Sequence, residues 1–103
     1  MLEKTKVSTA RWNEEYQRVV DLTAKRNAFF GVWDTSSKVV WACHKALKEY
    51  EGKVNRDERY VSMLVQMETA AADKVAQLDP IISRIDSEIS ARMEFLQNND
   101  GVA

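Results

Sequence analysis

Three side chains in the 103-residue sequence have chemistry that could support a reaction: Cys43, His44 and Glu68. Cys43 and His44 are adjacent, and adjacent side chains on a helix point about 100° apart, so the two cannot chelate one metal ion in the usual i,i+4 manner. A Cys-His nucleophilic pair also needs a third group to orient it, and the sequence identifies none. We therefore expect no catalytic residue, no metal site and no cofactor, with Cys43 in the core and His44 on the surface.

His44 is followed by Lys45 and Lys48, which would give a helical nucleophile two cationic neighbours. The segment from His44 to Gly52 loosely resembles histidine phosphotransfer domains, although it lacks the stretch of small residues that those domains carry. A histidine phosphotransfer-like domain is therefore a weaker alternative for the function.

Glu68 falls near the centre of the widest apolar arc that helical periodicity produces in this sequence. A buried carboxylate without a partner is costly, so we expect it to meet an indole, a tyrosine or a basic side chain from another helix. If this arc is a subunit interface, Glu68 would fix the register of the contact.

The elements that must position these residues are helices. Three glycines, one proline and long runs of helix-forming residues predict an all-α chain. We expect one domain over residues 1–103, a small antiparallel bundle of three or four helices, either alone or as a homodimer. The expected helices cover about residues 9–30, 35–52, 56–78 and 80–97, with a frayed tail over 98–103.

Three breaks define these helices. Ser8 or Thr9 is the expected cap of the first helix, Gly31 its end, and Asn55 or Asp57 the start of the third helix. Pro80 is expected to begin the fourth helix, with Asp79 as its cap, or to kink one longer helix.

Charge and hydropathy narrow the class of protein. No apolar run is long enough to cross a bilayer, the first residues do not resemble a signal peptide, and Cys43 is the single cysteine. We therefore expect a cytoplasmic protein without a membrane contact. The formal net charge of −1 disfavours a general nucleic-acid binder, and a nucleic-acid-binding accessory role is a weaker alternative.

The charge is unevenly divided along the chain. Residues 1–53 carry ten Lys and Arg against seven Asp and Glu, or +3, whereas residues 54–103 carry five against nine, or −4. This asymmetry could pair the two halves, pair two copies, or present a basic face to an acidic partner.

Aromatic residues divide into core and surface candidates. Phe30 falls on the expected core stripe of the first helix, together with Trp12 and Val19. Trp41 lies nearly opposite the core stripe of the second helix. The residues predicted to bind a partner, on an aromatic and basic face, are Arg18, Leu22, Lys25, Phe29, Trp33, Trp41, Lys45 and Lys48.

These patterns predict a non-enzymatic protein-protein interaction module, which we expect to form a homo-oligomer. It would be a small helical adaptor, chaperone or inhibitor, of the sort that phages and secretion systems carry, and its partner would be an acidic protein. The alternative is a self-assembling structural helical subunit.

Overall fold

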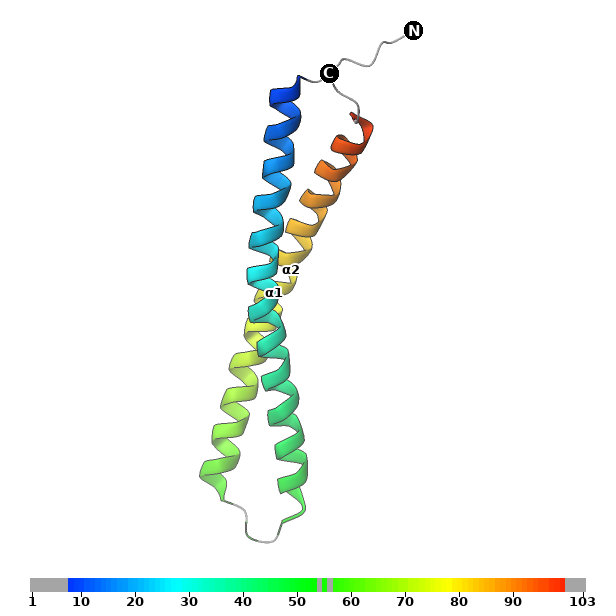
Figure 1. The fold of residues 1–103 in the computed structure, drawn as a ribbon. Helices are drawn as coiled ribbons and strands as arrows, with labels where there is room; N and C mark the ends of the chain where they lie inside the picture. The colour runs from blue at the N-terminus through cyan, green and yellow to red at the C-terminus, as the bar shows by residue number, and fades with distance from the viewer. Residues whose placement is uncertain (1–7, 54, 56, 100–103) are drawn as a thin grey trace. The chain divides into compact units, whose positions relative to one another are not determined.

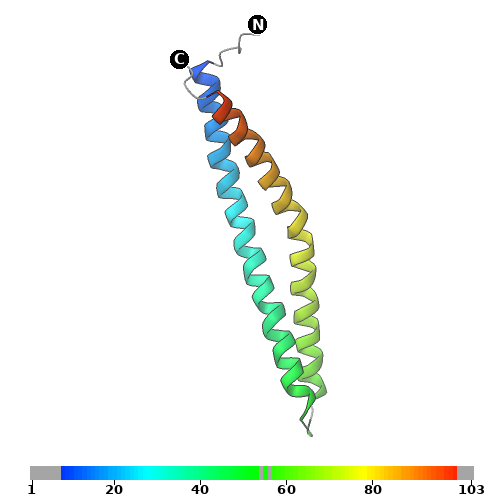
Figure 2. The same ribbon diagram turned by 90° about the vertical axis from the view of Figure 1, so that its right-hand side faces the viewer.

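Two long helices make up the fold. The computed structural model describes residues 8–53, 55 and 57–99, and within them α1 spans Thr9–Glu51 and α2 spans Glu58–Asn98 (Figure 1). The all-α prediction is confirmed. The predicted bundle of three or four helices is wrong, because neither expected internal break ends a helix; Figure 2 shows both helices as uninterrupted ribbons. Residues 100–103 of the expected frayed tail lie outside the described residues.

α1 continues through the segment around Gly31 that was expected to end a helix. A glycine inside a helix costs only about 1 kcal/mol relative to alanine, which local contacts can offset. The Thr35 hydroxyl donates a hydrogen bond to the Gly31 carbonyl at 3.0 Å, and Lys38 pairs with Asp34 one turn away at 3.0 Å. The small polar residues of this segment therefore bond within the helix and do not cap a new one.

α2 likewise continues through Pro80, which settles the alternative left open at this residue in favour of one helix. Proline removes one backbone donor but its φ angle suits a helix. Asp79, the expected cap of a fourth helix, accepts a hydrogen bond from the Trp33 indole nitrogen at 2.6 Å. A contact between the two helices therefore uses the carboxylate that local sequence assigns to capping.

The N-terminal end of each helix is capped by one of the residues that local sequence predicts. The Ser8 hydroxyl accepts a bond from the Arg11 amide at 3.1 Å, and the Asp57 carboxylate accepts one from the Arg59 amide at 3.0 Å, so these residues are the N-caps. Between the helices, the Tyr50 hydroxyl accepts a bond from the Asp57 amide at 2.6 Å and donates one to the Asn55 carbonyl at 3.4 Å.

The chain divides into two units, each built from one segment of α1 and one of α2. Unit 1 comprises residues 1–28 and 82–103, and unit 2 comprises Phe29–Ile81, including the connection between the helices. In unit 1, the Trp12 indole donates to the Leu96 carbonyl at 3.4 Å. In unit 2, the rings of Tyr50 and Tyr60 meet edge to face with centroids 5.2 Å apart. Together with the contacts of Arg26 with Asp86 in unit 1 and of Trp33 with Asp79 in unit 2, these contacts show that the two helix segments are antiparallel within each unit.

Buried and half-buried side chains recur in both helices at alternating intervals of three and four residues, the spacing by which two helices pack along one line. We call these the seam positions. In α1 they are Trp12, Glu15, Val19, Leu22, Arg26, Phe29, Trp33, Ser36, Val40, Cys43, Leu47 and Tyr50. In α2 they are Val61, Leu64, Glu68, Ala71, Val75, Leu78, Ile82, Ile85, Ile89, Arg92 and Leu96.

The seam corrects the expected core of α1. Leu22 is 6 % exposed and belongs to the seam, whereas Phe30, the predicted core residue, is 39 % exposed and stacks on Trp33 at 5.5 Å. The reason is that Glu15 and Arg26 occupy seam positions, where an apolar stripe would not place them. In α2, helical periodicity places Met93 on one stripe with Ile82, Ile85 and Ile89, but Arg92 takes the seam position and Met93 is exposed.

The described helices are too polar to span a bilayer. For residues 8–53, 55 and 57–99, this agrees with the expectation that no apolar run is long enough to cross a bilayer.

Candidate protein-binding surface

Trp41 is the most exposed large apolar side chain of the described residues, at 73 %. It lies on α1 within unit 2, two positions before the buried seam residue Cys43, so its ring faces away from α2. His44, one turn further along, meets the indole edge to face at a centroid distance of 6.5 Å. The exposure of Trp41 that helical periodicity predicts is confirmed.

Two lysines stand beside this indole. Lys45 and Lys48 follow Trp41 on the same side of α1, and neither forms an ion pair within the described residues. Together with Trp41, His44 and Glu49 they line a hollow of about 340 Å³. An indole with unpaired ammonium groups at its edge can contact an apolar side chain and a carboxylate at the same time.

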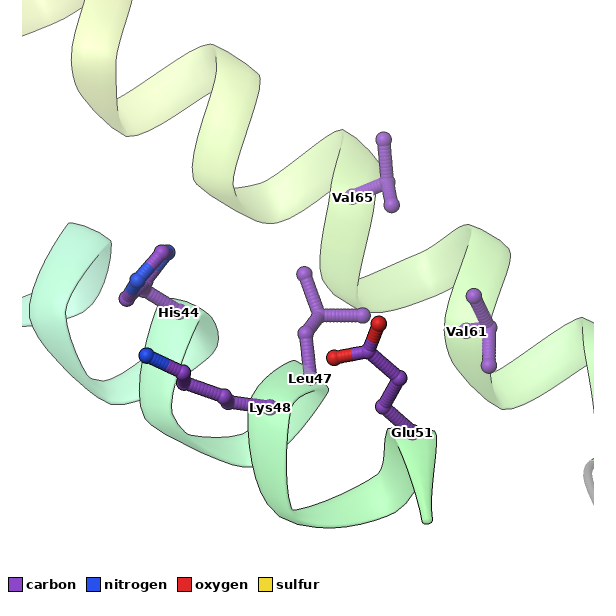
Figure 3. Close-up of a pocket in the computed structure, with 6 residues that line it drawn as sticks. All are labelled: His44, Leu47, Lys48, Glu51, Val61 and Val65. Atoms are coloured by element: carbon purple, nitrogen blue, oxygen red, sulfur yellow. The ribbon is translucent and has the colours of Figure 1, made fainter. Parts of the chain in front are cut away.

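A second hollow, of about 400 Å³, lies next to the first and shares His44 and Lys48 with it. It opens between the two helices of unit 2 (Figure 3). α1 contributes His44, Leu47, Lys48 and Glu51, and α2 contributes Val61 and Val65. Three aliphatic side chains thus supply apolar contact and three polar ones border them. We call the residues lining the two hollows the Trp41 surface.

Glu68 lies close to this surface at a seam position of α2. Its side chain is half-buried, and its carboxylate oxygen is 3.9 Å from the Nδ1 atom of His44 on α1. The expectation that Glu68 meets a side chain of another helix is consistent with this neighbour. Its role in fixing register at a subunit interface stays a prediction.

The residues with reactive side chains do not gather at one place. Cys43 is 3 % exposed, in the seam, and does not line either hollow, whereas His44 lines both. Among residues 8–53, 55 and 57–99, no group of three or more histidine, cysteine, aspartate and glutamate side chains is placed to hold a metal ion.

Two of the predicted partner-binding residues, Phe29 and Trp33, contribute to the contact between the helices of unit 2. Both are half-buried at seam positions, and the Trp33 indole is bonded to Asp79 of α2. The sequence-based placement of these rings on an outer flank is therefore wrong, because Glu15 and Arg26 occupy the seam and shift it from the stripe of Phe30 to that of Phe29 and Trp33.

The other predicted residues lie apart from Trp41 along α1. Leu22 is buried in unit 1, which contradicts its expected exposure, because α2 covers this side of α1. Arg18 and Lys25 are exposed in unit 1, and Trp41, Lys45 and Lys48 lie in unit 2. Of the eight predicted residues, the structure brings Trp41, Lys45 and Lys48 together on one surface.

Sequence reasoning missed the aliphatic part of the Trp41 surface, which is Leu47, Val61 and Val65. Helical periodicity alone places Leu47 and Val65 on the apolar stripes of their helices, and so predicts both to be in the core, although Val65 is exposed. The signal was available in the spacing of three and four residues, because Val65 comes directly after the seam residue Leu64 and so lies at the edge of the helix pair.

Comparison of the chain with protein-family models, with curated proteins and with solved structures gave no significant match.

Proposed function

We propose that this chain is a non-enzymatic binding module that recognises an acidic helical segment of another protein through the Trp41 surface. The observation that carries the proposal is the 73 % exposure of Trp41 beside two lysines that have no ion pair in the described residues. Tryptophan is enriched in the energetic centres of protein interfaces, and lysines at the border of such a centre can attract the carboxylates of a partner.

Charge complementarity selects the partner. Lys45, Lys48 and the imidazole of His44 border an aliphatic floor made by Leu47, Val61 and Val65. A helical segment with one apolar side chain directed into the hollow and carboxylates one turn to either side would satisfy both features. Glu49 and Glu51 lie near the C-terminal end of α1 on this surface, where they would disfavour a partner that is acidic over its whole length.

The test uses two synthetic amphipathic helical peptides with the same leucine and phenylalanine face, one with glutamates and the other with lysines along its border. Binding to the full chain is measured by fluorescence anisotropy of labelled peptide. We expect the glutamate peptide to bind and the lysine peptide to bind at least about tenfold more weakly. Binding of both peptides alike, or of neither, would contradict the proposal.

Two variants locate the site, and a third is their control. Trp41→Ala is expected to weaken binding of the glutamate peptide by about tenfold or more, as truncation of a central aromatic does. Lys45→Glu should weaken it and reduce its dependence on salt concentration. Lys25→Glu makes the same change of charge on α1 in unit 1 and should leave affinity within about twofold. An equal loss with Lys25→Glu would assign binding to general charge.

A further inference from the structure

A second surface of unit 2 is apolar, and it lies on the side away from the hollows. Both hollow-lining residues His44 and Glu51 come directly after a seam position in α1, as Val65 does in α2. Every second seam position, such as Trp33, Val40 and Leu47 in α1, is preceded by a residue that lies on the opposite side of the helix pair. These residues are Val32, Val39 and Ala46 in α1 and Tyr60, Met67, Lys74 and Ile81 in α2. We call them the apolar flank.

The composition of the apolar flank is specific to unit 2. Val32, Tyr60, Met67 and Ile81 are among the large apolar side chains that stay exposed. The corresponding positions of unit 1 carry Arg11, Arg18 and Lys25 in α1 and Glu88 and Phe95 in α2. Lys74 is the one charged residue of the apolar flank.

Two helices that pack only on each other need two apolar positions in every seven. A helix that also packs on a third helix needs a third apolar position, next to the first two. The segments of α1 and α2 in unit 2 both provide that third position, on the same side. No side chain of the described residues is completely enclosed, which is also the pattern of a helix pair that lacks part of its packing.

The area of this face matches a stable dimer. The helix segments of unit 2 run from Phe29 to Glu51 and from Glu58 to Ile81, so each is about 35 Å long at 1.5 Å per residue. Two helices side by side are about 20 Å wide. A face of roughly 700 Å² on each of two copies gives about 1,400 Å², within the range of 1,200–2,000 Å² that stable interfaces bury.

The apolar flank is also complementary to itself. Val32 and Ala46 are equally far from Val39 along α1, and the midpoint between Tyr60 and Ile81 lies one residue from the middle of their α2 segment, Glu58–Ile81. The contact of Trp33 with Asp79 and that of Tyr50 with Tyr60 place those two midpoints at nearly the same level of the helix pair. A two-fold axis at this level would set Tyr60 of one copy against Ile81 of the other, as a symmetric dimer requires.

From the width, area and symmetry of the apolar flank we propose that a second copy of this chain covers it. The two copies of unit 2 form four helices around a shared apolar layer. The Trp41 surface lies on the other side of each helix pair and stays open for its own partner.

Sedimentation equilibrium of the full chain tests this dimer. We expect twice the 11.8 kDa mass of one chain and a mass that falls on dilution. Met67→Glu places a charge in the apolar flank and should raise the dimer dissociation constant by about tenfold or more. Its matched control is Met93→Glu in α2 of unit 1, because Met93 is 41 % exposed and Met67 is 45 % exposed. The control should change the constant by no more than about twofold.

Lys74→Leu keeps the test decisive if Met67→Glu reduces folding, which circular dichroism would show. Replacing the charged residue of the apolar flank with leucine should tighten the dimer several-fold, roughly as expected for added apolar contact. A wild-type chain that is monomeric at about 1 mM, which corresponds to only about 4 kcal/mol of association, would overturn the proposal. Equal weakening by Met67→Glu and Met93→Glu would overturn the assignment to this flank. Trp41→Ala should leave the dimer intact, so failure of peptide binding and failure of dimerisation are separate results.

Discussion

Units 1 and 2 are built from the same two helices, but the short ion pairs that join the helices lie in unit 1, whereas the described contacts of unit 2 are mainly those of aromatic side chains. In unit 1, charged residues stand in and beside the seam: Arg92 donates to Glu15 at 2.5 Å and Arg26 donates to Asp86 at 3.0 Å. In unit 2, aromatic contacts join the helices, namely Tyr50 with Tyr60 and the Trp33 indole with Asp79.

The difference separates two tasks. A charged residue in a seam accepts few partners, so the ion pairs of unit 1 specify which residues of α1 face which residues of α2. Four of the five positions of unit 1 that correspond to the apolar flank are charged as well, so this side of unit 1 needs no cover. Unit 2 leaves Trp41 and the apolar flank exposed, so it has surface available for other chains. We therefore propose that unit 1 specifies the pairing of the helices and that unit 2 carries the surfaces that bind other chains.

The largest expected change in the free energy of unfolding is at a seam residue of unit 1, and it is compared with the change at an outer residue of unit 2. Leu22→Ala should lower the free energy of unfolding by about 3 kcal/mol, because the leucine is buried between the helices. Phe30→Ala should cost about 1 kcal/mol, since much of the ring is already in water. Urea denaturation followed by circular dichroism, at one protein concentration, measures both. If the order were reversed, the seam would run along the stripe that contains Phe30.

The wrong prediction for Phe30 shows which features of the fold the sequence of one helix can predict. Local sequence predicts the helical class, the buried Cys43 and the exposed Trp41, and it narrows each N-cap to two residues, Ser8 or Thr9 and Asn55 or Asp57. Each of these features depends on the neighbouring residues of its own helix. The choice between Leu22 and Phe30 depends on residues of the other helix. Arg92 and Asp86 allow Glu15 and Arg26 to stand on the seam, and no pattern within α1 contains that information.

The predicted helix breaks at Gly31 and Pro80 are wrong for a related reason. Gly31 and Pro80 are strong local signals, but the cost of each is only about 1–3 kcal/mol, and contacts along both helices exceed it. The hydrogen bond from Trp33 to Asp79 joins two residues that lie close to these expected breaks. The exposure of Trp41 beside Lys45 and Lys48 was predictable from α1 alone, whereas the meeting of Leu47 with Val61 and Val65 depends on how α2 pairs with α1.

The second prediction tests whether the charged seam of unit 1 fixes the pairing. Glu15→Arg would set two guanidinium groups against each other and should lower the free energy of unfolding by about 2 kcal/mol, since both native side chains are largely buried, at 21 % and 28 % exposure. Arg92→Glu should have a similar cost. The double variant exchanges the two charges and should recover at least about half of the summed loss.

The control for this exchange is in unit 2. His44→Ala removes the neighbour of Glu68, but the imidazole is exposed and 3.9 Å away, so the loss should stay within about 0.5 kcal/mol. Denaturation of all four variants gives the coupling energies. Strictly additive losses at Glu15 and Arg92 would mean that their ion pair does not set the pairing.

The smallest expected change in the free energy of unfolding is at Gly31. Its sign distinguishes a continuous helix from one that is broken at this residue. Nothing lies within 4 Å of a Cβ atom added at this residue, and the backbone there is helical, so Gly31→Ala should raise the free energy of unfolding by about 0.5–1 kcal/mol. Ala42→Gly, at an exposed position of the same helix in unit 2, is the matched reverse change and should lower it by a similar amount. Thermal denaturation at fixed concentration measures both. If alanine at Gly31 destabilised the chain, this glycine would hold the left-handed conformation that ends a helix, and α1 would be two helices in solution.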